Sequence, residues 1–344
     1  MSFLALRISF PSRLTQAAIV LTSWAAVSTG FDSAAAAEPA RIKIGVQGTI
    51  GCDPSPRRVK RLVIDKPGVY ENYLVDGEWG DSTLVKINAD NVTLRRCEVR
   101  NGKHNAVNVN AANVVIEDCK IHHVLAGSFK NQKDAHGITG RPTNLTIRNC
   151  DIGLTSGDSI QFDPGRGPWD RVLIENCTLW SAPLEQDAGE FKRGERPGEN
   201  GVDTKQRTTN PRSQLTIRNC LFHGWQQAGQ VSNMAALNLK NQIEAKVENC
   251  VFRDNEISLR LRGGSGEYGG ALVSVQNCLV YDSLVAVRAE DKIENLKIHR
   301  LGLGSGVKRK FQAAGGGTGS GYEYANEFTP PPLAEVLARG LIAN

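Results

Sequence analysis

Apolar and polar positions follow one repeating pattern in seven short segments of the chain. In LTIRNCDI (145–152), Leu145 and Ile147 alternate with polar residues, and Cys150 and Ile152 alternate again after a polar interruption. Such alternation predicts strands, and the change of phase predicts a tight bend between two of them. The other segments are VTLRRCEV (92–99), VVIEDCKI (114–121), VLIENCTL (172–179), LTIRNCLF (215–222), AKVENCVF (245–252) and VSVQNCLV (273–280).

A third alternating segment belongs to each repeat. The repeats recur at intervals of 22 to 43 residues, which is typical of a solenoid. Three strands per coil, each paired with the coils above and below, predict an all-β, single-stranded right-handed parallel β-helix. The third strands are AVNVN (106–110), GITGR (137–141), SIQFD (159–163), GVDTK (201–205), ALNLK (236–240), SLRLR (258–262) and LVAVR (284–288).

The bend residue before the cysteine is asparagine in five repeats, at Asn149, Asn176, Asn219, Asn249 and Asn277. Asparagine tolerates the left-handed backbone conformation, and stacked amides can hydrogen-bond from coil to coil, so we expect an asparagine ladder. The following cysteines would point inward and stack at about 4.8 Å. Their odd number and common context predict free, buried thiols rather than disulfides. Cys52 lies outside the repeat, and we expect it to be reactive.

The first 37 residues resemble an export signal. Arg7 and Arg13 precede an uncharged apolar stretch at 14–31, and small residues follow at 33–37. The alternative is a membrane anchor, but polar residues interrupt the stretch. We therefore expect a cleaved signal at 1–37 and a periplasmic or secreted monomer without a membrane span. The remaining ranges predict an N-terminal cap and first coil (38–90), the β-helix repeats (91–305) and a Gly/Pro-rich C-terminal cap (306–344), with a helix at 333–341.

The overall charge does not indicate nucleic-acid binding. The formal net charge is +5, and removal of 1–37 would leave +4. Aromatic residues make up 6% of the chain, too few for base-stacking platforms. The placement of charge is more informative than its sum.

Outward residues of the third strands form two predicted columns. Five of the seven positions in the second column are cationic, and like charges at coil spacing are unfavourable unless an anion lies over them. A solvated charged face is the alternative, but we favour a groove for a polyanion such as an acidic polysaccharide. The first column is Asn108, Thr139, Gln161, Asp203, Asn238, Arg260 and Ala286; the second is Asn110, Arg141, Asp163, Lys205, Lys240, Arg262 and Arg288.

The cysteine-and-asparagine coils resemble the pectate lyase superfamily of parallel β-helices over about 80–305. Within this region, AALNLKNQIEAKVENCVFRDNEISLRLRGG (235–264) is similar to the signature of the alginate lyase and chondroitinase B group. This resemblance implies that Lys240 is the catalytic base and Arg262 the catalytic arginine. The chain departs from the signature in two respects: Gly263 replaces a histidine, and Asn233 and Ala235 stand where that group has a calcium-binding acidic pair.

A second scheme competes with the first. Asp158, Asp163 and Asp203 resemble the aspartates that hold calcium on neighbouring coils of pectate lyases, which implies a calcium cofactor and Lys205 as the base. His136, in DAHGI (134–138), resembles the Asp-x-His element of a β-helix mannuronate epimerase. The residues that we expect to bind substrate are Arg141, Asn238, Arg260, Arg288 and His136.

Both schemes predict a polysaccharide lyase that cleaves a uronate chain by β-elimination. An enzyme of this kind neutralises the uronate carboxylate and supplies a base for the proton at carbon 5. We expect like-charge repulsion from Arg262 and Lys205 to lower the pKa of the lysine base. The alternatives are a non-catalytic polyanion- or carbohydrate-binding protein, a uronate C5-epimerase, or a glycoside hydrolase, for which Asp158 is the candidate carboxylate.

Overall fold

A computed structural model describes residues 40–163, 167–226, 231–264, 269–293, 295–317 and 321–342. The predicted export signal at 1–37 lies outside these ranges. Within them, no helix is both long and apolar enough to cross a bilayer.

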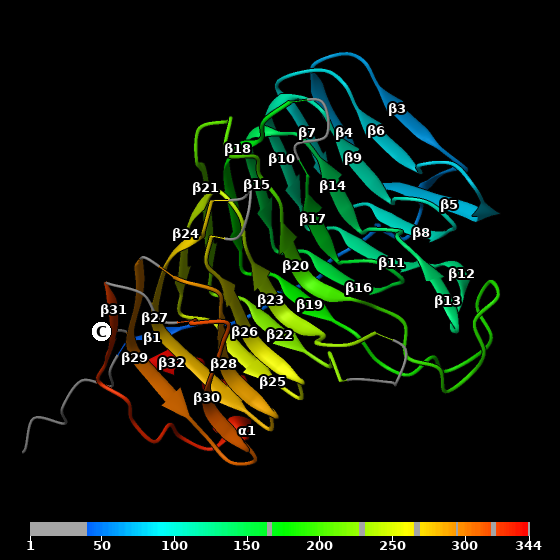
Figure 1. Ribbon diagram of the computed structural model, residues 1–344. Helices are drawn as coiled ribbons and strands as arrows, with labels where there is room; N and C mark the ends of the chain where they lie inside the picture. Colours follow the sequence, from blue (N-terminus) through cyan, green and yellow to red (C-terminus); the bar gives the residue numbers. More distant parts are fainter. Residues whose placement is uncertain are drawn as a thin grey trace, which may run out of the picture. The chain divides into compact units, whose positions relative to one another are not determined.

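The described residues form a β-helix whose coils have three faces (Figure 1). The first and second faces adjoin at the asparagine bend, and β27 (Leu272–Tyr281) and β29 (Asn295–Leu303) run through both. The first face otherwise contains β4 (Gly68–Glu71), β7 (Val92–Arg95), β10 (Ala112–Glu117), β15 (Thr143–Arg148), β18 (Asp170–Glu175), β21 (Ser213–Arg218), β24 (Ile243–Glu248) and β31 (Tyr322–Ala325). The second contains β2 (Arg57–Val59), β5 (Tyr73–Gly80), β8 (Glu98–Gly102), β11 (Lys120–Val124), β16 (Asp151–Thr155), β19 (Thr178–Trp180), β22 (Leu221–His223) and β25 (Val251–Arg253).

The third face is a separate parallel sheet of ten strands. All seven predicted third strands lie in it, which confirms the predicted fold class. Its strands are β3 (Leu62–Ile64), β6 (Val85–Ile87), β9 (Val107–Val109), β14 (Ile138–Gly140), β17 (Ile160–Phe162), β20 (Asn200–Thr204), β23 (Ala235–Leu239), β26 (Ile257–Arg262), β28 (Val285–Glu290) and β30 (Arg309–Ala314).

The cysteines of the repeat lie in the apolar core, as predicted. All eight cysteines are free, and the seven from Cys97 to Cys278 are fully buried. Each of these thiols lies against a backbone carbonyl, and the N–H groups of Cys150 and Cys177 point at the sulfur of the next cysteine along. Burial raises the pKa of the Cys150 thiol well above its usual value. The thiols therefore act as small apolar packing groups.

The five bend asparagines all have positive φ, between 51° and 56°. The amide ladder is only partly continuous: Asn277 donates to Asn249 at 2.8 Å, and Asn149 donates to Asp118 at 2.6 Å. The side-chain oxygen of Asn219 is buried without a hydrogen-bond partner in the described structure. The left-handed backbone is thus the constant requirement at this bend, and the ladder is secondary.

The N-terminal segment 41–51, which we call the strap, runs along the asparagine bend and crosses successive coils. β1 (Arg41–Ile42) pairs antiparallel with β32 (Leu341–Ile342), so the first and last described strands meet (Figure 1). Farther along the strap, Gly45 donates its N–H to the carbonyl of Asn219, and Gly51 donates to Asp118. The strap therefore links the last coils to the first ones.

The chain ends differ from the predicted caps. Coils extend beyond residue 305, since β30 pairs with β28 and β31 pairs with β29. The predicted helix is present as α1 (Leu333–Arg339), but Val336 packs laterally on Leu279 and Tyr281 of the second face. Outward apolar residues on these coils provide that docking surface, a feature that the repeat pattern alone did not reveal.

The buried thiols predict a labelling pattern. We expect a thiol reagent to modify no repeat cysteine in the folded protein and all of them in denaturant. Cys52 is half-buried, and burial raises its pKa to about 11, so it should react slowly and faster as the pH approaches that value. Mass spectrometry after timed labelling checks this; modification of more than one thiol in the folded state contradicts it.

The strap predicts a second outcome. Gly45 has φ 73°, and a Cβ there would lie 2.6 Å from Oγ1 of Thr178. Gly45→Val should therefore destabilise the protein by about 3 kcal/mol. Gly48 has φ 69° but open space around it, so Gly48→Ala measures the left-handed backbone penalty alone, about 1 kcal/mol. Equal losses of unfolding free energy in the two variants would show that the strap does not pack tightly.

Candidate functional site

The outward columns of the third face are as predicted except in the coil of β28. There Arg260 pairs with Arg288, and Arg262 pairs with Glu290. Arg288 therefore belongs to the first column, and its predicted place in the second is wrong by two residues. Alternation of period two is unchanged by a shift of two, so it cannot fix this register. The register follows instead from the turn at 282–284, which stacks on the turn at 254–256.

Glu290 lies among three guanidinium groups, which we call the arginine cluster (Arg260, Arg262 and Arg288). Its carboxylate lies 3.0 Å from Nε of Arg260, 3.2 Å from Nε of Arg262 and 2.6 Å from Nε of Arg288. Burial alone would raise the pKa of Glu290, but the arginines outweigh it and lower that pKa. The predicted column of uncompensated like charges is therefore wrong, because the protein supplies an anion of its own.

The two candidate lysines share a carboxylate in the same way. Asp203 lies 2.9 Å from Nζ of Lys240 and 3.7 Å from Nζ of Lys205, and Asp163 lies 3.8 Å from Nζ of Lys205. We call Lys205 and Lys240 the lysine pair. Their side chains are 34% and 17% exposed, so Lys205 is the more accessible to solvent.

Carboxylates dominate the charge environment of Lys205. Burial alone would lower its pKa, but the carboxylates of Asp203 and Asp158 outweigh burial and raise it. Burial likewise raises the pKa of Asp203, although the ammonium groups of Lys240 and Lys205 act in the opposite direction. Lys205 therefore keeps its proton at neutral pH.

A third carboxylate beside the lysine pair, Glu199, was missed by the sequence analysis. Burial and the charge of Asp203 raise its pKa. It ends the long loop 181–199, whose residues Leu184 and Phe191 pack in a small apolar cluster with Leu125. The unusual length of this loop could have drawn attention to Glu199, because the loop ends directly before β20 and so brings its last side chain to the third face.

His136 and Asp158 form a buried polar pair at the edge of the same face. Nδ1 of His136 accepts the backbone N–H of Asp158 at 3.0 Å, which leaves Nε2 as the protonated nitrogen of the neutral ring. Burial lowers the pKa of His136 to about 4. Asp158 is fully buried and accepts hydrogen bonds from Asn200 at 2.8 Å and Gln161 at 2.7 Å.

The structure does not assemble the predicted calcium site from Asp158, Asp163 and Asp203. Among the described residues, no group of three or more His, Cys, Asp or Glu side chains is placed to hold a metal ion. The oxygens of Asp158 are occupied by amide donors, and Lys205 lies within 4 Å of both other carboxylates. These residues therefore do not fit calcium in the described arrangement.

The other residues that were predicted to bind substrate differ in how exposed they are and where they lie. Asn238 is only 2% exposed, and His136 is 6% exposed, so neither offers a free surface to a polymer. Arg141 lies farther along the second column and donates to Asn110 at 3.4 Å.

The arginine cluster and the lysine pair occupy consecutive coils, because β26 pairs directly with β23 and β23 with β20.

Several solved structures with similar coils are distant from this chain in sequence. Pectate lyase Pel9A is 12% identical with a TM-score of 0.46, covering 83% of this chain and 72% of that one. An alginate lyase from Paenibacillus sp. is 11% identical with a TM-score of 0.45, covering 76% and 93%. The A-module of the Azotobacter vinelandii mannuronan C-5 epimerase AlgE4 is 11% identical with a TM-score of 0.37, covering 80% and 88%. No curated protein matches the sequence.

A family model matches the middle of the chain. Residues 83–233 fit the model described as a right-handed β-helix region. This range includes β6 to β22 and ends before the arginine cluster. The described part of the chain therefore has the fold of a right-handed parallel β-helix, and residues 83–233 match the family model of that fold.

Proposed function

We propose that the protein is a polysaccharide lyase that cleaves a uronate-containing polysaccharide by β-elimination on the third face. The observation that carries this proposal is the arginine cluster on the coils next to the lysine pair. Three guanidinium groups face Glu290, and Asp291 lies 3.5 Å from Arg262, so the arginines outnumber the carboxylates with which they form ion pairs. A uronate carboxylate fits this surplus.

In this proposal the arginine cluster neutralises the carboxylate of the uronate at the cleaved bond. Arg262 is the most exposed of the three arginines, at 33%, and is the candidate for direct contact. When arginine neutralises the uronate carboxylate, the hydrogen at carbon 5 becomes more acidic. A base removes that proton, a double bond forms between carbons 4 and 5, and the bond from carbon 4 to the glycosidic oxygen breaks. The departing oxygen takes up a proton.

Lys240 is the proposed base. The raised pKa of Lys205 keeps its ammonium charged, so it already compensates the Asp203 carboxylate that both lysines share. We therefore assign the role of base to Lys240, and Lys205 is proposed to bind substrate. The carboxylic acid of Glu199, whose pKa is raised, is a candidate proton donor to the departing oxygen.

Hydrolysis is a second candidate, favoured by one observation. Glu199 and Asp203 are neighbouring carboxyl groups, and burial raises the pKa of both. Glycosidases use one protonated and one ionised carboxyl group at the cleaved bond. Elimination is nevertheless preferred over hydrolysis, because Lys205 and Lys240 both lie within 4 Å of Asp203 and engage its carboxylate in ion pairs.

The first test is turnover of polyanions. We expect the purified mature protein to release unsaturated sugars from at least one of alginate, polygalacturonate, hyaluronan and chondroitin sulfate, seen as rising ultraviolet absorbance. New reducing ends without absorbance would establish hydrolysis instead. A change of uronate composition without chain shortening would establish epimerisation, and retention of a polyanion without any reaction would identify a binding protein.

The second test separates the lysines. Lys240→Ala should lower kcat by about a hundredfold or more, since general-base catalysis contributes that much or more. Lys205→Ala should mainly raise KM. Lys246 is exposed on the first face and gives a matched control, for which we expect unchanged kcat and KM. If Lys205→Ala is inactive and Lys240→Ala nearly normal, the assignment of the base is reversed.

A further inference from the structure

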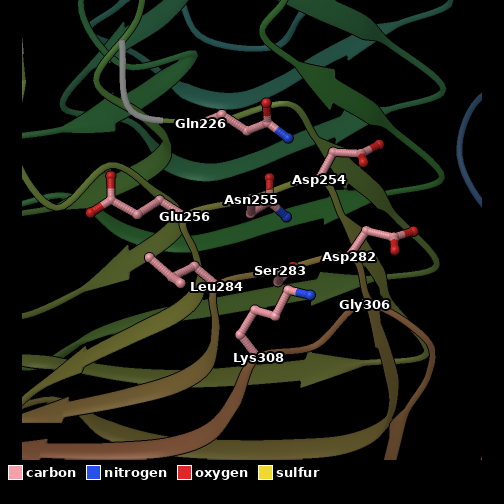
Figure 2. Close-up of a pocket in the computed structure, with 9 residues that line it drawn as sticks. All are labelled: Gln226, Asp254, Asn255, Glu256, Asp282, Ser283, Leu284, Gly306 and Lys308. Carbon is pink, nitrogen blue, oxygen red and sulfur yellow. The ribbon is translucent and has the colours of Figure 1, made fainter. Parts of the chain in front are cut away.

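A pocket lies at the corner where the second face turns into the third. The turns that form this corner differ greatly in length along the β-helix. Residues 181–199 make a long loop, whereas 254–256 and 282–284 are tight three-residue turns on the following coils. The short turns form a recessed shelf with a pocket of about 520 Å³, which we call the corner pocket. Figure 2 shows its lining: Gln226, Asp254, Asn255, Glu256, Asp282, Ser283, Leu284, Gly306 and Lys308.

The floor of the corner pocket is rigid. Asn255 and Ser283 are 2% and 0% exposed. The side-chain oxygen of Asn255 accepts the N–H of Trp225 at 3.2 Å, and the hydroxyl of Ser283 donates to the carbonyl of Tyr281 at 2.8 Å. Leu284 donates its backbone N–H to the carbonyl of Asn255 at 3.0 Å, which joins the two turns. A ligand would therefore meet a preformed surface.

The two sides of the corner pocket carry different kinds of side chain. Figure 2 shows the carboxylates of Asp254 and Asp282 on one side, one above the other, and the side chains of Glu256 and Leu284 on the opposite side. Gly306 packs so closely on Asp282 that an added Cβ would lie 2.0 Å from its Oδ1. Leu284 is 54% exposed, which is unusual for leucine in this protein.

The charge of the corner pocket is opposite to that of the arginine cluster. Three carboxylates and one ammonium, that of Lys308, line it. Asp254 is paired with the guanidinium group of Arg253, so a uronate carboxylate placed there would be repelled mainly by Asp282. Sugar hydroxyls, in contrast, are donors that carboxylates and amides accept, and the aliphatic side chain of Leu284 can cover the apolar face of a sugar ring.

We propose that the corner pocket binds an uncharged sugar residue and excludes uronates. A volume of about 520 Å³ falls within the range of small-molecule sites and leaves room for a pyranose ring. Glu256 connects the pocket to the third face, because the charges of Arg288 and Arg260 act on its carboxyl group. We further propose that this sugar belongs to a polysaccharide with both acidic and neutral residues that lies on the third face. This part of the proposal rests on the proposed function.

The test uses Leu284 as a reporter. The full mature chain, with isotope-labelled leucine methyl groups, is titrated by NMR with methyl glycosides of glucose, galactose, mannose, rhamnose and N-acetylglucosamine. The matched controls are methyl glucuronoside and methyl galacturonoside, which differ from two of these ligands only in the carboxylate. We expect at least one neutral glycoside to shift the Leu284 methyl signals with a Kd in the millimolar range, and neither uronoside to do so.

Two variants complete the test. The double variant Asp254→Asn, Asp282→Asn keeps the left-handed backbone, which asparagine tolerates, and should weaken binding of the neutral glycoside about tenfold or more. Asp81→Asn, at an exposed position on another part of the chain, should leave it unchanged. The proposal is overturned if no neutral glycoside shifts Leu284, if the uronosides shift it equally, or if the double variant binds as the wild type does.

The outcome of the sugar-binding experiment does not depend on whether the protein cleaves a polyanion. Binding at Leu284 with no reaction on any polyanion would retain the pocket and refute the lyase. Turnover of polyanions with no sugar binding at Leu284 would retain the lyase and refute the pocket.

Discussion

The parallel pairing of consecutive coils is the constraint on which the rest of the structure depends. It repeats every outward side chain at about 4.8 Å, so any charge on one coil lies next to a charge on its neighbours. Two like unit charges at that distance repel by about 3 kcal/mol at an effective dielectric constant of about 20. The third face meets this constraint by inserting carboxylates, with Asp203 between the lysines and Glu290 among the arginines. Its cations are therefore organised into two neighbouring groups rather than one uniform column.

Much of the fold could be predicted because the local and the repeating signals agree. Alternation of apolar residues gave the three strands of each coil, and asparagine gave the left-handed bend, as at Asn149 and Asn277. The docking of α1 on Leu279 could not be predicted in the same way, since it depends on contacts between distant parts of the chain. The placement of Arg288 failed for another reason: a shift of two residues leaves the alternation intact, and only the stacked turns distinguish the two registers.

The candidate site was predicted less completely than the fold. Sequence reasoning identified Lys205, Lys240 and Arg262, which the structure brings to consecutive coils. It missed most of the carboxylates around the lysine pair, because it compared charges along one column and omitted carboxylates from the adjacent column and from a loop. Glu199 and Glu290 fell outside the short segments that define the columns. Electrostatics at such a site depends on all elements that meet there, whereas a strand pattern reports on one element at a time.

The strap changes how the stacked coils can respond to local disruption. In a solenoid whose units contact only their neighbours, coils at either end can open independently of the middle. Here β1 pairs with β32, and the strap then binds the bend at Asn219 and Asp118, so a segment near the start of the chain contacts late, central and early coils. Opening the last coil therefore breaks contacts that also hold the strap on earlier coils. This coupling favours cooperative unfolding of the described region, and it keeps the coils of the third face in the register on which the lysine pair and the arginine cluster depend.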